Sequence, residues 1–212
     1  MTNSSSNSAG AASATLDPSD QTDRIDDREM SARPYVLYLG CTIPQRATNY
    51  EMASRKVAEA LGLKFLDAPD MVCCGYPVAS VDRMVPLTMA ARNLAKAEAM
   101  GADLCCLCSA CTGSMTESAH ALEHDAALRE RVNENLAEIG LRYGGGVRVR
   151  HFARLLHEEV GPEAIAAKVQ RRIALRVAPH YGCHFLRPHT IHEGFDSVED
   201  PQVLDELLAA IG

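Results

Sequence analysis

The sequence has no tryptophan, and aromatic residues make up only 5% of its 212 positions. With so few aromatic side chains, the protein is not expected to form the stacking surface on which single-stranded nucleic acid binds. The 21 Lys and Arg are outnumbered by 28 Asp and Glu, and the formal net charge of −7 offers no basic face for a phosphate backbone. No run of 18 consecutive apolar residues occurs, so we expect no membrane span. We therefore expect neither nucleic acid nor a membrane as a partner.

Motifs for nucleotide binding and serine hydrolysis are missing as well, because the chain has neither a P-loop nor a G-x-S-x-G element. The three glycines at 144–146 lack the spacing of a dinucleotide-binding fingerprint and predict a flexible turn. What the sequence does contain is 8 cysteines in a regular pattern. We therefore look for its chemistry among the thiols.

Residues 1–33 are rich in Ser, Asn, Ala and Asp, so we expect a disordered tail. This stretch lacks the apolar segment that a secretory signal contains. It is also rich in acidic residues, whereas transit peptides contain few of them. We therefore expect a cytoplasmic protein with reduced thiols. In that compartment, clustered cysteines favour metal binding or catalysis over structural disulfides.

The remainder alternates between apolar runs and helical patterns. Apolar runs predict strands at residues 35–40, 63–68, 102–108, 147–151 and 173–180. Helical spacing predicts helices at residues 47–62, 82–101, 111–125, 126–139, 152–160 and 162–170. This alternation predicts an α/β fold with a mostly parallel sheet covered by helices on both faces. The regularly spaced cysteines follow the predicted strands, so we expect a cysteine cluster site at the carboxyl ends of the sheet.

Five cysteines form the constellation at this edge. Thirty-one residues separate the first from an adjacent pair, and thirty-three separate that pair from a C-x-x-C motif: Cys41, Cys73, Cys74, Cys108 and Cys111. Five thiolates exceed what one tetrahedral zinc ion uses. Adjacent cysteines need a sharp turn to face one centre, and Gly75 supplies the backbone freedom for it. The pattern favours a multinuclear cluster, and a C-x-x-C at a helix start suits an anionic thiolate–sulfide group.

The segments CTIPQRATNYE, MVCCGYPVA and LCSACTGS carry a family resemblance. They resemble the cysteine-rich CCG domain found in the B subunit of heterodisulfide reductase, and the resemblance covers residues 34–212. It implies a noncubane iron–sulfur cluster of the 4Fe-4S type, in which five cysteines hold two fused smaller clusters. The implied ligands are Cys41, Cys73, Cys74, Cys108 and Cys111.

Members of this family contain two such domains and reduce a small disulfide held between their clusters. The resemblance therefore implies a ferredoxin-like iron–sulfur subunit and a flavin-containing subunit as partners. We expect a CCG domain at residues 34–172 and the start of a second, incomplete one at 173–212. The segment HYGCHFLRP resembles the opening of the second domain and makes Cys183 a candidate ligand of a second, incomplete site. We interpret the chain as a fragment; the alternatives are a second half supplied elsewhere or a single-cluster protein.

Other cysteines and several histidines have simpler interpretations. Cys105 and Cys106 lie within a predicted strand, and we expect them to be small core residues. Four histidines surround Cys183 without a second nearby cysteine, so the pattern gives little support for a Cys/His metal site: His180, His184, His189 and His192. We hypothesise that His184 and Arg187 line a substrate or partner cleft, in which Arg would suit a carboxylate.

Three functions agree with these patterns. The leading hypothesis is an iron–sulfur subunit of a heterodisulfide reductase-like complex, acting on a disulfide and inactive alone. The second is an iron–sulfur electron-transfer subunit of a lactate, glycolate or succinate oxidoreductase. The third, from another class, is a zinc-stabilised interaction module, which would contain one zinc ion and no redox signal.

Overall fold

Four short parallel strands form the centre of the protein. In the computed structural model, which describes residues 33–172 and 174–212, these are β1 (Tyr35–Tyr38), β2 (Phe65–Leu66), β3 (Asp103–Cys106) and β4 (Val149–His151). Their order across the sheet is β2-β1-β3-β4. Tyr35 of β1 is in register with Phe65 of β2 on one side and with Asp103 of β3 on the other. The carboxyl ends of all four strands therefore lie along one edge.

Helices connect the strands and continue beyond the last one. They are α2 (Ile43–Arg46), α3 (Thr48–Ala60), α4 (Met84–Ala99), α5 (Ser109–His124), α6 (Ala126–Ala137), α7 (Phe152–Leu155), α8 (Pro162–Ala166), α9 (Cys183–Leu186) and α10 (Val203–Ile211). A 3₁₀ turn, η1 (Tyr76–Val78), and a π turn, η2 (Leu156–Val160), complete the described elements. The Asp82 carboxylate accepts hydrogen bonds from the N–H groups of Met84 and Val85 at 2.6 and 3.1 Å, which pairs two of the free N–H groups in the first turn of α4.

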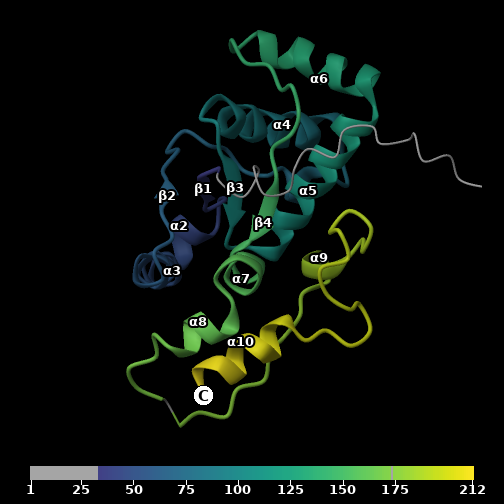
Figure 1. Ribbon diagram of the computed structural model, residues 1–212. Helices are drawn as coiled ribbons and strands as arrows, with labels where there is room; N and C mark the ends of the chain where they lie inside the picture. Colours follow the sequence, from purple (N-terminus) through teal and green to yellow (C-terminus); the bar gives the residue numbers. More distant parts are fainter. Residues whose placement is uncertain (1–32, 173) are drawn as a thin grey trace, which may run out of the picture. The chain divides into compact units, whose positions relative to one another are not determined.

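Alternating side chains of β1 reach two separate cores. Val36 and Tyr38 pack in a cluster with residues of α4, α5 and α6. Tyr35 and Leu37 point the other way and pack with residues of α2, α3 and α7. Figure 1 shows α4, α5 and α6 on one side of the sheet and α7 on the other. A strand buried on both faces explains why residues 35–40 form a continuous apolar run.

The predicted α/β fold is confirmed, and most elements end within a few residues of their predicted bounds. The helix expected at 162–170 is shorter, since α8 ends at Ala166. The strand expected at 173–180 is wrong. Residues 174–182 contain neither helix nor strand, and the Leu175 and Val177 side chains are 70% and 59% exposed. A strand requires a neighbouring backbone, and this segment pairs with none of the four described strands. The predicted disordered tail, apart from Arg33, lies outside the described residues.

The carboxyl-terminal part of the chain has a small core of its own. Phe185, Leu186 and Val203 are buried together, and Ala153 of α7 packs against them. Ion pairs also fix this part to the sheet, because one Glu193 oxygen accepts from Arg150 at 2.8 Å and from Arg154 at 2.6 Å. Residues 182–195 are thereby held against the strand and helix that precede them.

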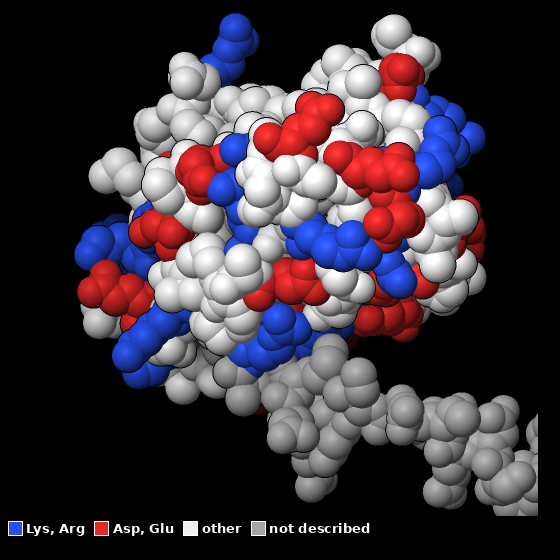
Figure 2. Space-filling view, turned by 90° about the horizontal axis from the view of Figure 1, so that it is seen from above, with Lys and Arg blue, Asp and Glu red and all other residues white. Residues whose placement is uncertain are grey.

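The described surface carries charges of both signs. On the face seen in Figure 2, basic and acidic side chains alternate without a continuous basic patch. Of the helices in residues 33–172 and 174–212, none is both long and apolar enough to cross a bilayer.

Candidate iron–sulfur site

Three strand ends bring the predicted ligands to one edge of the sheet. Cys41 follows β1, the adjacent pair Cys73 and Cys74 lies in the loop after β2, and Cys108 follows β3. Because β1 lies between β2 and β3, the three connections leave the sheet side by side. Cys108 caps the amino-terminal end of α5, and Cys111 lies in the first turn of that helix.

The five thiols lie in a row of neighbouring contacts. The Cys73 Sγ lies 3.7 Å from the Cys41 Sγ. Cys74 contacts both Cys73 and Cys111, and Cys111 in turn contacts Cys108. Within the described residues, no three His, Cys, Asp or Glu side chains surround a point in a way that would hold a single metal ion. Five neighbouring thiols exceed the four donors of one tetrahedral ion, which suits a group with several metal atoms.

Hydrogen bonds divide these thiols into proton donors and acceptors. The Cys111 thiol lowers the pKa of Cys108 to about 5, and the backbone N–H groups of Cys111 and Ala110 add to this effect. The same thiol lowers the pKa of Cys74 to about 6. Burial raises the pKa of Cys73 to about 11, and the bonds to Cys108 and Cys74 raise the pKa of Cys111. The bond from Cys111 thus favours a thiolate at Cys74 or Cys108, and the N–H groups at the amino terminus of α5 add to this effect at Cys108.

Two glycines allow this close approach. Gly75 has φ = 83°, and a Cβ there would lie 2.4 Å from the Cα of Pro86 in α4. The predicted sharp turn after the cysteine pair is therefore confirmed, and it also requires the absence of a side chain. Gly40 has φ = 65°, and its Cβ would lie 2.9 Å from the Cys111 Sγ. Glycine before Cys41 thus lets the β1 end approach α5.

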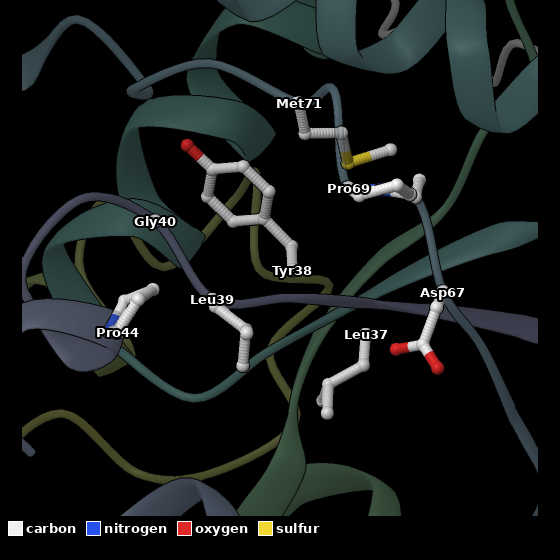
Figure 3. A pocket seen from close by; sticks show the side chains of 9 residues that line it. Leu37, Tyr38, Leu39, Gly40, Pro44, Asp67, Pro69 and Met71 are labelled. Atoms are coloured by element: carbon white, nitrogen blue, oxygen red, sulfur yellow. The ribbon is translucent and has the colours of Figure 1, made fainter. Parts of the chain in front are cut away.

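A cavity of about 290 Å³ lies beside the row, at the carboxyl ends of β1 and β2. Figure 3 shows its lining, in which Leu37, Leu39, Pro44 and Met71 supply mostly apolar surface. Gly40 also lines it, so the cavity lies next to the Cys41 end of the row.

The comparisons with known proteins agree with this geometry. Residues 35–116, which contain all five cysteines of the row, match the CCG family of cysteine-rich domains. Residues 35–116 are a CCG domain. The predicted resemblance to the B subunit of heterodisulfide reductase is confirmed by two archaeal relatives.

The B subunit of the Ferredoxin/F(420)H(2)-dependent CoB-CoM heterodisulfide reductase of Methanosarcina acetivorans is 34% identical over 83% of this chain and 59% of its own length. A heterodisulfide reductase B-subunit-like protein of Archaeoglobus profundus is 37% identical over 84% of this chain and 61% of its own. The 8-methylmenaquinol:fumarate reductase membrane anchor subunit of Wolinella succinogenes is 31% identical over 85% and 62%. The chain thus spans about three fifths of the length of these curated relatives.

A solved structure shares the fold over about three quarters of this chain. The crystal structure of a hypothetical protein from Helicobacter pylori superimposes with a TM-score of 0.53 on 76% of this chain and 36% of its own. The sequence identity of 16% limits this likeness to the fold.

Two further cysteines lie inside the CCG domain and away from solvent. Cys105 and Cys106 are both 0% exposed in β3, as expected for core residues. Cys105 belongs to the core on the α7 side, whereas Cys106 packs in the core that also contains Cys74 and Cys111.

The histidines around Cys183 do not gather on one point. Cys183 is exposed at the start of α9, and among the described residues it forms no metal-binding group with the four histidines. His184 instead contacts the CCG domain, where its Nε2 lies 3.0 Å from the Tyr76 hydroxyl. A Cβ on Gly113 of α5 would lie 2.9 Å from the Cβ of His184. Arg187 lies 3.6 Å from Glu199 in an exposed ion pair.

The residues that hold the backbone next to the cysteine pair are not among those predicted from the sequence. Tyr38 and Asn93 both bond to the backbone of Val72, directly before Cys73. The available signal was a lone asparagine on the apolar face of an alanine-rich helix.

Proposed function

We propose that this chain is an iron–sulfur electron-transfer subunit of a heterodisulfide reductase-like complex. The observation that carries the proposal is the convergence of five cysteines on one sheet edge, in a CCG domain similar to the B subunit of heterodisulfide reductase. A cluster of the noncubane 4Fe-4S type would be held by Cys41, Cys73, Cys74, Cys108 and Cys111. When bound, such a cluster supplies one-electron transfer at low potential.

The donor set fits this group. All five candidate ligands are sulfur, the softest donor in proteins, and their row allows adjacent thiolates to bind different irons. The Cys111 thiol lowers the pKa of Cys74 and of Cys108, and Cys111 itself would have to give up its proton to serve as a ligand. The amino terminus of α5 adds N–H groups that stabilise an anionic centre.

We propose further that residues 34–172 form the first cysteine-rich domain and 173–212 the opening of a second. Two local features support this division. Gly40-Cys41 precedes the four-residue helix α2, and Gly182-Cys183 begins the four-residue helix α9. Cys183 would then be the first ligand of a second site. The proposed partners are a ferredoxin-like iron–sulfur subunit, a flavin-containing subunit and a small disulfide, and the cytoplasmic location stays a prediction.

The first experiment measures iron, acid-labile sulfide and zinc in anaerobically purified protein, with an EPR spectrum of the same sample. We expect roughly four irons and four sulfides per chain, and loss of most iron in a Cys73→Ser variant. Cys105→Ala is the matched control, because Cys105 is buried in the core on the other face of the sheet. One zinc with negligible sulfide would refute the proposal and leave the zinc-stabilised interaction module.

The Wolinella succinogenes relative favours a second candidate, an electron-transfer subunit of a dicarboxylate-type oxidoreductase. Adding oxidised glutathione or fumarate to the reduced protein separates the two. An EPR signal altered by the disulfide alone supports the disulfide reductase. A signal altered by fumarate and not by the disulfide would instead support the second candidate.

A further inference from the structure

Asn93 is a buried polar side chain in an apolar helix face. It is 0% exposed on α4, where its neighbours Ala90, Leu94 and Ala97 are equally buried. A buried amide destabilises a protein unless its donor and acceptor are both paired. Asn93 meets this condition with one residue, because its Oδ1 accepts from the Val72 N–H and its Nδ2 donates to the Val72 carbonyl, both at 2.9 Å.

Val72 directly precedes the cysteine pair. The loop after β2 has no neighbouring strand at this point in the described structure. The Asn93 amide therefore pairs the Val72 N–H and carbonyl, as the backbone of a neighbouring strand would. The Tyr38 hydroxyl donates to the same carbonyl at 2.8 Å. On the other side of the pair, the Ser114 hydroxyl donates to the Cys74 carbonyl at 3.1 Å. The backbone that carries Cys73 and Cys74 is therefore held at both ends by side chains of the sheet and its helices.

The fold contains the same arrangement a second time. Asn133 of α6 is 3% exposed, accepts from the Tyr143 N–H at 2.9 Å and donates to the Tyr143 carbonyl at 3.0 Å. Tyr143 leads into the glycine-rich turn at 144–146 rather than into a cysteine loop. The two asparagines thus make the same pair of hydrogen bonds and are buried to a similar degree. Only Asn93 adjoins the five-cysteine row.

We propose that Asn93 is a positioning residue that holds the Cys73–Cys74 pair ready for the metal cluster. This inference rests on the proposed iron–sulfur function. Without the two Asn93 bonds, the Val72 carbonyl keeps only its bond from the Tyr38 hydroxyl. The loop that carries the cysteine pair is then free to move. Groups that orient metal ligands typically affect metal retention by tenfold or more, although they do not touch the metal.

The test compares Asn93→Leu with Asn133→Leu, which remove the same pair of hydrogen bonds at the two places. Iron release to a ferrous chelator is followed anaerobically in the full chain. We expect release to be about tenfold faster in Asn93→Leu and within about twofold of wild type in Asn133→Leu. Equal release from both variants would overturn the proposal, since the effect would then be general destabilisation.

A second readout does not depend on the cluster. In metal-free reduced protein, iodoacetamide labelling of Cys73 and Cys74 is mapped by mass spectrometry. We expect the labelling rate of Cys74, which is 3% exposed, to rise about tenfold in Asn93→Leu and to stay unchanged in Asn133→Leu. Should Asn93→Leu fail to fold, Tyr38→Phe removes one bond to Val72, and we expect a rise of about threefold.

The two readouts separate the possible failures. Wild-type protein without iron would defeat the proposed function, while the labelling rates still decide whether Asn93 fixes the cysteine pair. Wild-type protein with iron, but with unchanged release and labelling in Asn93→Leu, would defeat the role of Asn93 alone.

Discussion

His151 couples the stability of this protein to pH. It ends β4, and its Nδ1 accepts the Ala153 N–H at 3.1 Å, which caps α7. Its ring also packs edge-on against Phe185, with the ring centroids 4.8 Å apart. Burial lowers the pKa of His151 to about 4, although a bond to the Leu107 backbone opposes this change. The folded protein therefore keeps the imidazole neutral.

The sign of the effect follows from proton binding in the two states. An unfolded histidine titrates near 6.5. Between pH 6.5 and pH 4 the unfolded chain binds the proton and the folded chain does not, so stability falls as the pH falls through this range. From pH 7.5 to pH 5.0 the two pKa values give a loss of at most about 2 kcal/mol. Other groups titrate as well, so the comparison must be made with a variant.

We expect His151→Asn to remove this part of the pH dependence. Asparagine is a good helix cap and accepts the same N–H without titrating. Urea unfolding at pH 7.5 and 5.0, with both proteins in the same metal state, should show a smaller loss in the variant by about 2 kcal/mol. The lost contact with Phe185 lowers the unfolding free energy equally at both pH values, so it cancels in the difference between them. An equal loss in the two proteins would refute the neutral, half-buried His151.

The remaining predictions concern backbone strain and buried charge. Gly75→Ala should lower the iron content and reduce the unfolding free energy by at least about 2 kcal/mol. The control is Gly62→Ala, where φ is 80° and an added Cβ has no atom within 4 Å; it should cost only about 1 kcal/mol and keep iron. Comparable iron loss in both would contradict the steric argument. Asp103→Asn, in a fully buried carboxylate paired with an arginine, should cost about 2 kcal/mol in urea unfolding. Arg154→Met should remove one of the two arginines that hold Glu193, together with the bond to the His192 carbonyl, and speed proteolysis within residues 187–195. An unchanged cleavage pattern would count against the ion-pair anchor.

Local patterns were enough to predict the elements that surround the cysteines. The helix expected at 47–62 is α3 (Thr48–Ala60), and the one at 82–101 is α4 (Met84–Ala99), because each has an apolar stripe and a clear end signal. The site edge was also predictable, since parallel strands place their carboxyl ends together. Every cysteine of the row lies at that edge.

Long-range pairing could not be predicted in the same way. Residues 173–180 have the composition of a strand, but a strand forms only beside another, and no local signal says whether one is present. The bonds between Asn93 and Val72 join residues 21 positions apart, and the contact of His184 with Gly113 joins helices α5 and α9. Such contacts depend on the packed fold rather than on neighbouring residues.

The strand order explains why three short strands are enough to build the site. The chain leaves β1 in one direction to form β2 at the sheet edge and returns past β1 to form β3 on its other side. The crossover connections on the two sides of β1 therefore diverge and leave a crevice above its carboxyl end, the usual ligand position in open parallel sheets. Cys41 follows β1, the Cys73–Cys74 pair follows β2 on one side of it, and Cys108 follows β3 on the other. Cysteines separated by more than thirty residues can thus reach one edge of the sheet without long-range rearrangement of the chain.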